Sequence, residues 1–217
     1  MPHDAPASPP RHRLRYLALG DSYTIGEGVE AGGSWPMQLA RALRDEGIPL
    51  GDPQVIATTG WTTDELDAAI DAAAPPDDFD LASLLIGVNN QYRGRGAEEY
   101  ARQFEGLLER TIGFVGGDPG RAFVLSIPDW GVTPFAAASG RDVGAIGREL
   151  DAFNAIAARQ CGQHGVAFVD ITPASRALGA QPRMLAGDGL HPSAAMYEKW
   201  AELALPVARR LLQRGQK

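Results

Sequence analysis

A hydroxyl, an imidazole and a carboxylate occur in this sequence in a pattern that suits nucleophilic catalysis. Ser22 ends a small-residue turn, residues 20–22, that follows the apolar run of residues 14–19. A serine hydroxyl needs a base to accept its proton and a carboxylate to orient that base. His191 and Asp188 lie three residues apart near the other end of the chain and are the candidates for those two roles. We therefore take Ser22 as the candidate nucleophile.

The same chemistry needs hydrogen-bond donors for the negative charge that develops on the attacked carbonyl oxygen. Gly60 lies in the loop after residues 54–57, a short predicted strand. Asn89 follows residues 81–88, the most apolar stretch of the chain. The backbone amide of Gly60 and the side-chain amide of Asn89 are the candidate donors.

Each of these signals has a structural alternative when it is taken alone. Residues 20–22 suit a local turn, and the glycines around them suit a phosphate cradle, although a P-loop lysine and a dinucleotide-binding spacing are both missing. Asp188 could cap the last helix and leave His191 as a solvated surface residue. Asn89 could lie in a turn, and Gly60 in a simple bend. The signals gain strength only if the fold brings them to one place.

The order of the predicted elements does bring them together. Apolar runs predict strands, and helical spacing of apolar residues predicts helices. We expect strands at residues 14–19, 54–57, 81–88, 122–127 and 166–170, and helices at 35–46, 97–114, 143–164 and 194–212, with a further helix capped by Thr62 or Thr63 and ended by Pro75. Strands that alternate with helices predict an α/β fold, a parallel sheet covered on both faces. The candidate residues after the first three strands then share the sheet edge where ligands bind, beside a long loop expected at residues 128–135.

Composition excludes several classes of protein. The 217 residues are 44% hydrophobic, but no apolar run approaches the roughly 20 residues that a membrane span requires. A net charge of −7 argues against a nucleic-acid partner. Cys161 is the only cysteine, so neither an intrachain disulfide nor a thiolate metal site can form, and no second histidine stands at ligand spacing from His191. We expect no metal and no other cofactor, and the sequence does not indicate an oligomeric state.

The first residues differ in composition from the rest. Residues 1–13 are rich in proline and polar side chains, which predicts a disordered leader before a single domain at residues 14–217. Prolines also interrupt the apolar segment that a secretory signal would need, so cytoplasmic residence is the expectation.

Four sequence blocks resemble those of the SGNH hydrolase family, also called GDSL esterases and lipases. They are Gly20-Asp21-Ser22-Tyr23, Gly60-Trp61-Thr62-Thr63, Gly87-Val88-Asn89-Asn90 and Asp188-Gly189-Leu190-His191-Pro192. Their order and spacing match the family from about residue 14 onward. The chain departs from the family pattern at Asn90, where the third block usually has Asp, and at Thr58, where the second usually begins with Asn.

The resemblance implies a fold, an activity and a set of site residues. The fold would be a three-layer α/β/α sandwich like flavodoxin, with a five-stranded parallel sheet in the order 2-1-3-4-5. Ser22 would be the nucleophile, His191 the base and then the acid, and Asp188 the orienting carboxylate. The oxyanion donors would be the backbone amides of Ser22 and Gly60 and the side chain of Asn89.

The prediction is therefore a metal-independent serine esterase that works through an acyl-enzyme. Its partner would be a small-molecule ester: a carbohydrate acetate, a small acyl ester, a lysophospholipid or a thioester, all of which the family cleaves. Asp21 lies in the first block, Tyr92 and Arg93 closely follow the third, and these three residues are candidate substrate contacts. The alternative is a non-catalytic sugar- or lipid-binding domain that retains the fold.

Overall fold

The computed structural model describes residues 13–214, and within them five parallel strands form one sheet. The strands are β1 (Tyr16–Gly20), β2 (Gln54–Ala57), β3 (Leu81–Leu85), β4 (Ala122–Leu125) and β5 (Ala167–Val169). Their order is β2-β1-β3-β4-β5, which confirms the predicted topology. Every residue of β1, β3 and β4 is buried, as expected for central strands covered on both faces.

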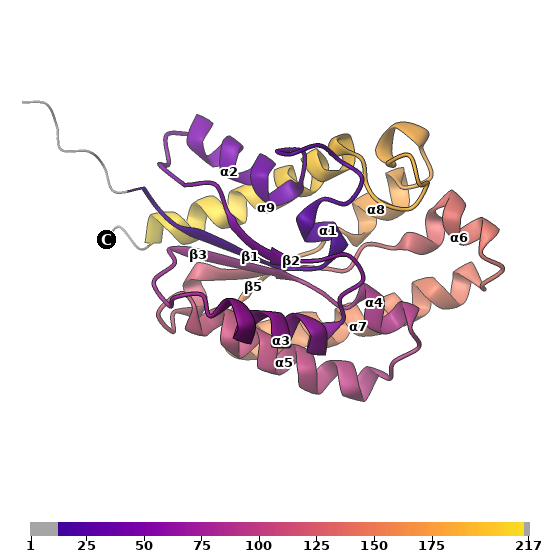
Figure 1. Cartoon of the computed structure of the whole chain (residues 1–217), viewed down its shortest axis with the longest axis horizontal. Helices are drawn as coiled ribbons and strands as arrows, with labels where there is room; N and C mark the ends of the chain where they lie inside the picture. The colour runs from indigo at the N-terminus through magenta and orange to yellow at the C-terminus, as the bar shows by residue number, and fades with distance from the viewer. Residues whose placement is uncertain (1–12, 215–217) are drawn as a thin grey trace, which may run out of the picture.

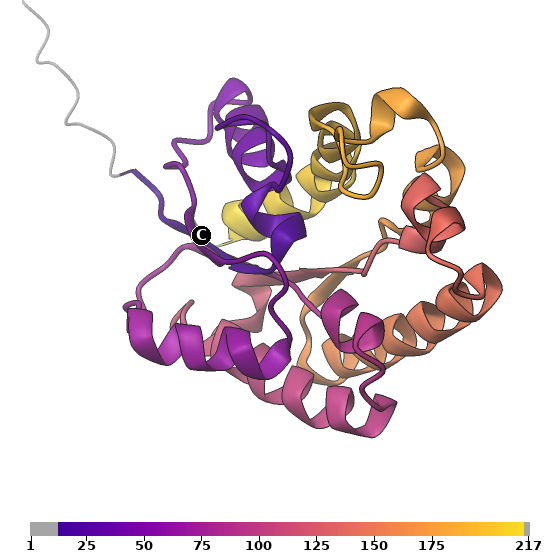
Figure 2. The same cartoon turned by 45° about the vertical axis from the view of Figure 1, so that its right-hand side comes forward.

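Helices cover both faces of the sheet, giving the three-layer α/β/α arrangement (Figure 1). The helices α2 (Trp35–Asp45) and α9 (Ala194–Arg214) pack together on one side. The helices α3 (Thr63–Ala73), α5 (Ala97–Gly113) and α7 (Val143–His164) lie on the other. Figure 2 shows the same two layers from another side, with α2 and α9 on one side of the sheet and α3, α5 and α7 on the other.

The predicted helix boundaries agree best with the structure where a capping residue marks the start of the helix. Residues 143–164 form α7 as expected, because the Asp142 carboxylate accepts hydrogen bonds from the amides of Gly144 and Ala145 at its start. Thr62 caps α3 through the predicted capping box with Glu65. The strands β3, β4 and β5 end before the predicted ranges do, because the last residues of those ranges lie in the loops at the carboxyl edge; β1 begins two residues later than predicted.

Two predictions about that edge were wrong. Residues 86–88 do not extend β3; instead, α4 (Val88–Tyr92) begins there, so Asn89 lies on a short helix. The backbone changes from strand to helix at Gly87, whose φ of +127° is unfavourable for other residues. A Cβ at this position would also lie 2.6 Å from the Tyr100 ring.

The second concerns residues 128–135, predicted as an irregular loop. They contain the 3₁₀ turn η2 (Trp130–Val132) and the start of α6 (Pro134–Ala138). Asp129 and Thr133 cap these turns, and Pro134 occupies a first helical position where its missing N–H costs nothing.

The remaining elements are short. Helix α1 (Ser22–Ile25) follows β1, the 3₁₀ turn η1 (Pro119–Arg121) precedes β4, and α8 (Thr172–Leu178) and η3 (Pro182–Met184) fill the region between β5 and α9. Apart from Arg13, the predicted leader lies outside the described residues, and the single-domain assignment stays a prediction. No helix of residues 13–214 is long and apolar enough to span a bilayer.

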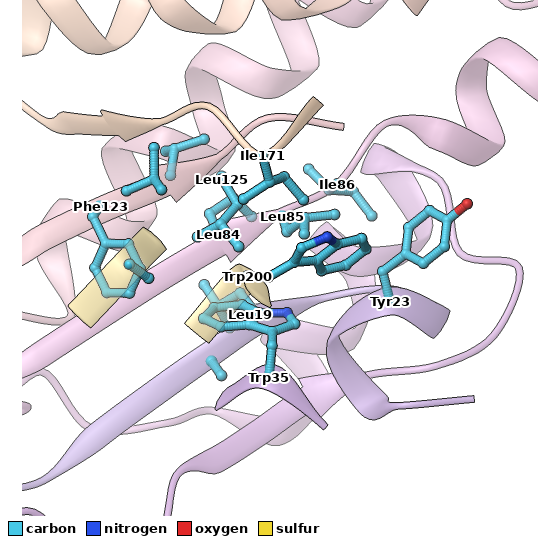
Figure 3. Packing of buried hydrophobic residues seen from close by; sticks show 14 of the residues in the cluster. Leu19, Tyr23, Trp35, Leu84, Leu85, Ile86, Phe123, Leu125, Ile171 and Trp200 are labelled. Carbon is cyan, nitrogen blue, oxygen red and sulfur yellow. The ribbon is translucent and has the colours of Figure 1, made fainter. Parts of the chain in front are cut away.

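The core on the α2 and α9 side reaches as far as α1 (Figure 3). Trp35 and Trp200 are fully buried and pack near Leu19 of β1. The Tyr23 ring of α1 meets Trp200 edge to face, with centroids 5.8 Å apart. Close packing of this kind holds α1, and with it Ser22, in a fixed position at the end of β1.

Candidate active site

Ser22 is the first residue of α1 and lies directly beyond the end of β1. Asp21 caps the helix, because its Oδ1 accepts a hydrogen bond from the Tyr23 amide at 3.0 Å. A first helical residue has no intrahelical partner for its N–H, so the Ser22 amide is available as a donor. Within residues 13–214, the Ser22 hydroxyl makes no hydrogen bond.

His191 and Asp188 form a hydrogen-bonded pair in the turn before α9. The ring Nδ1–H of His191 donates to Asp188 Oδ2 at 2.5 Å, which leaves Nε2 as the free acceptor. Asp188 Oδ1 accepts from the amides of Leu190 and His191, both at 2.9 Å. Partial burial alone would raise the pKa of the Asp188 carboxyl, but these hydrogen bonds, the one from the His191 ring foremost, outweigh it and lower the pKa.

Gly60 lies in the loop that follows β2, and Asn89 lies on α4, which contacts that loop. Gly60 has a φ of +87°, in the left-handed region, and its N–H has no hydrogen-bond partner within the described residues. The Asn89 side-chain amide donates one N–H to the Trp61 carbonyl at 2.9 Å. An amide nitrogen carries two N–H donors, so the second remains for another acceptor.

One pocket of about 240 Å³ brings these groups together. Ser22, Gly60, Asn89 and His191 all line it, although they come from four separate parts of the sequence. The remaining lining side chains are largely apolar or aromatic: Tyr23, Thr59, Val88, Tyr92, Trp130, Phe135 and Leu190. A serine hydroxyl, a paired histidine and two amide donors around one cavity form an arrangement that suits acyl transfer.

A family model now places the chain among known proteins. Residues 18–199 match the model of the GDSL-like Lipase/Acylhydrolase family, which is most of the sequence. The chain belongs to that family. It is therefore an ester hydrolase, and the predicted family resemblance is confirmed.

Solved structures agree with the fold of this hydrolase. The structure of TesA aligns over 91% of this chain and 99% of its own, with a TM-score of 0.71 and 20% identity. Axe2, an acetylxylan esterase from Geobacillus stearothermophilus, aligns over 90% and 94%, with a TM-score of 0.68 and 19% identity. A lipase/acylhydrolase from Enterococcus faecalis aligns over 90% and 96%, with a TM-score of 0.65 and 18% identity. No curated protein sequence matches this hydrolase.

Of the three candidate substrate contacts, only Tyr92 lines the pocket. Its side chain is 41% exposed and meets Trp130 edge to face, with centroids 5.4 Å apart. The Arg141 guanidinium lies 4.2 Å from the centre of the Tyr92 ring and donates to the Tyr92 carbonyl at 3.0 Å. Tyr92 thus forms a supported wall of the hydrolase pocket.

Asp21 is fully buried and lies outside that pocket. Burial raises the pKa of its carboxyl to about 7, although the hydrogen bond from the Tyr23 backbone amide acts to lower it. Its second oxygen, Oδ2, has no partner among the described residues. In this hydrolase Asp21 therefore contacts the helix that carries Ser22, not the space where a substrate would lie.

Arg93 also lies outside the pocket that Ser22 lines. Its guanidinium donates to the Gly60 carbonyl at 2.6 Å and to Glu65 Oε1 at 3.1 Å. In the structure, then, Arg93 contacts the loop of residues 58–62 and the start of α3.

Three residues that line the pocket were not predicted individually from the sequence: Trp130, Phe135 and Leu190. Trp130 and Phe135 belong to the region predicted as a loop, and its aromatic content was the available signal. Leu190 lies between Asp188 and His191, where a lone apolar residue in a polar turn was the only hint.

Proposed function

We propose that this hydrolase is a serine esterase in which Ser22, His191 and Asp188 act as the catalytic triad. The observation that carries the proposal is the hydrogen-bonded His191–Asp188 pair beside the pocket that Ser22 also lines. The Nδ1 bond to Asp188 orients the ring and stabilises its protonated form, and the free Nε2 is the atom that accepts the serine proton.

The reaction runs in two halves. Ser22 Oγ bonds to the ester carbonyl carbon while its proton passes to His191 Nε2, and the ester C–O bond then breaks as His191 returns that proton to the leaving alcohol. A water molecule next attacks the acyl-enzyme, giving its proton to His191. The acyl–Ser22 bond breaks, Ser22 Oγ regains a proton from His191, and the carboxylic acid leaves.

We propose three donors for the oxyanion that forms in each half: the Ser22 amide, the Gly60 amide and the second N–H of Asn89. Two supporting facts are that neither backbone amide has a partner within residues 13–214 and that all three residues line one pocket. Donors fixed before the reaction need not reorganise as charge develops, which is why such a site accelerates acyl transfer.

The pocket walls favour a compact apolar or aromatic acyl group. Tyr92, Trp130, Phe135 and Leu190 present apolar surface beside Ser22, and the volume of about 240 Å³ is at or below the lower end for small-molecule sites. Acetates and short acyl or aryl esters of an alcohol or a sugar fit this description better than long-chain lipids do.

A fluorophosphonate and a series of aryl esters test the proposal. The phosphonate should add once per chain, at Ser22, as located by peptide mass spectrometry. Hydrolysis of aryl esters should be fastest for the shorter acyl chains and fall as the chain lengthens. Inactivation by a chelator that an added divalent metal reverses would instead indicate a metallohydrolase.

Activity should rise with pH across the neutral range, because the proposed mechanism needs a neutral imidazole to accept the proton of Ser22. Asp188 stays ionised over this range, since its hydrogen bonds lower its pKa. The measurement is kcat/KM for an aryl acetate across the neutral range.

Asp21 is the control for that profile, because burial raises the pKa of its carboxyl to about 7 and so into the same range. Asp21→Asn keeps a capping oxygen for the Tyr23 amide but cannot titrate. The rise should persist in this variant. If it disappears, Asp21 and not His191 governs the profile.

Gly60→Ala should lose turnover by about tenfold or more, because a side chain disfavours the left-handed φ and shifts the amide that faces the pocket. Gly47→Ala is the matched control: Gly47 has a φ of +86°, and a Cβ there meets nothing within 4 Å. Both variants should lose about 1–2 kcal/mol of stability in chemical denaturation. Equal turnover in the two would argue against the Gly60 amide as a donor.

A further inference from the structure

Asn89 of α4 and Arg93, the residue that caps the carboxyl end of α4, hold the loop of residues 58–62 through side chains that are four residues apart. Asn89 donates to the Trp61 carbonyl at 2.9 Å, and Arg93 Nη2 donates to the Gly60 carbonyl at 2.6 Å. Residues at this spacing lie on the same side of a helical turn, so both reach the same strip of backbone. Two successive carbonyls of the loop are thereby fixed to α4 and its C-cap residue.

The other half of the Arg93 guanidinium ties the same loop to α3. Arg93 Nη1 donates to Glu65 Oε1 at 3.1 Å, while Glu65 Oε2 accepts from the Thr62 amide at 2.9 Å. The hydrogen bond from the Thr62 backbone amide is the main cause of the lowered pKa of the Glu65 carboxyl, and the hydrogen bond from Arg93 lowers it further. Glu65 therefore remains a charged partner at neutral pH, and Arg93 bridges it to Gly60.

Gly60 needs such support because glycine adopts positive and negative φ with similar ease. A free loop with glycine at this place would sample several orientations of the amide. On the far side, the Thr59 hydroxyl donates to the Glu27 carboxylate, so side chains hold the loop both before and at Gly60. The contact from Arg93 is the one that reaches Gly60 itself.

We propose that Arg93 is a positioning residue of the oxyanion site: its guanidinium fixes the Gly60 carbonyl and so keeps the Gly60 N–H directed at the pocket. This inference rests on the proposed serine esterase mechanism. Arg93 lies outside the pocket that contains Ser22, so it acts through Gly60 and does not contact the substrate. A guanidinium suits this role, since its separate amino groups donate in a fixed plane to two acceptors.

Arg93→Met keeps an extended side chain and removes both hydrogen bonds, and Arg95→Met is the matched control. Arg95 lies two residues further along, and among the described residues its side chain pairs with the carboxylates of Asp64 and Glu99 and makes no bond to the loop carbonyls. Arg93→Met should lower kcat about ten- to a hundredfold with KM nearly unchanged, because a misplaced amide costs less than a missing one. Arg95→Met should keep the wild-type kcat.

A second variant keeps the inference testable if Arg93→Met folds poorly. Arg93→Lys retains the charge and a single donating nitrogen, and should recover part of the lost kcat, about threefold or more over Arg93→Met if the loop contact matters. Thermal melts of all variants report folding. The rate of fluorophosphonate addition should fall in parallel with kcat, since that reaction uses the same oxyanion donors.

Three results would overturn the inference. One is an unchanged kcat in Arg93→Met, another is an equal loss in Arg95→Met, and the third is a rise in KM confined to anionic esters, which would make Arg93 a substrate contact. Failure of the mechanism itself looks different: the wild-type protein would not react with the phosphonate at Ser22, whatever residue stands at 93.

Discussion

Ser22→Ala should fold as the wild type does and lose turnover on the order of a millionfold, as other serine hydrolases do without their nucleophile. The Ser22 hydroxyl makes no hydrogen bond within residues 13–214, so its removal leaves no buried partner unsatisfied. Alanine is also a good residue for a first helical turn. Loss of the attacking oxygen is then the only large effect of the change.

Two measurements check this expectation. Hydrolysis of an aryl acetate should fall to the uncatalysed background, and the melting temperature should stay within a few degrees of the wild type. The variant should also fail to bind fluorophosphonate covalently. A purified Ser22→Ala protein that keeps even a tenth of the wild-type rate would remove Ser22 from the mechanism.

The residues that local sequence fixes were the easiest to predict. Asp188 and His191 meet within one turn, where a separation of three residues brings the carboxylate to Nδ1. Ser22 follows a strand that its apolar run identified, and the helix caps at Thr62 and Asp142 lie where capping chemistry predicts them. Each of these depends on neighbours along the chain, so single-sequence reasoning has access to them.

Features that depend on distant contacts could not be predicted in the same way. The Asn89 helix replaces a predicted strand end because Gly87 reverses the backbone against Tyr100, thirteen residues later. Arg93 adjoins a sequence block and was expected to contact substrate, yet its hydrogen bonds go to Gly60 and Glu65. Neither pairing leaves a periodic signal in the sequence.

The residues of the pocket walls were also hard to predict from the sequence alone. Trp130 and Phe135 come from short turns whose caps are single polar residues, and such turns have no apolar repeat for a pattern to detect. Tyr92 forms a wall because Arg141 supports its ring from a segment 49 residues away. The type of chemistry, ester hydrolysis, was therefore accessible from sequence, whereas the shape of the pocket was not.

Asn89→Ala should lower turnover roughly a hundred- to a thousandfold, about 2.7–4 kcal/mol of transition-state stabilisation, with little change in KM. The variant removes the donor proposed for the oxyanion and the bond to the Trp61 carbonyl. Asn89→Asp should be at least as damaging, because a carboxylate beside the developing negative charge adds repulsion to the lost hydrogen bond. Steady-state kinetics on aryl acetate, with thermal melts, measures both variants.

Asn90→Asp is the matched control, since the adjacent asparagine is fully buried and lies outside the pocket. Asn90 Oδ1 accepts from the Thr63 amide at 3.1 Å, and Nδ2 donates to the Thr63 hydroxyl at 2.7 Å. An aspartate can keep the first bond, but for the second the Thr63 hydroxyl must turn its only proton from Gln103 Oε1 to the new carboxylate. The variant should melt lower because it buries a carboxyl group, yet keep turnover within about tenfold, since no transition-state donor is removed. Comparable losses at both positions, or a larger one at Asn90, would mean that Asn89 is not the oxyanion donor.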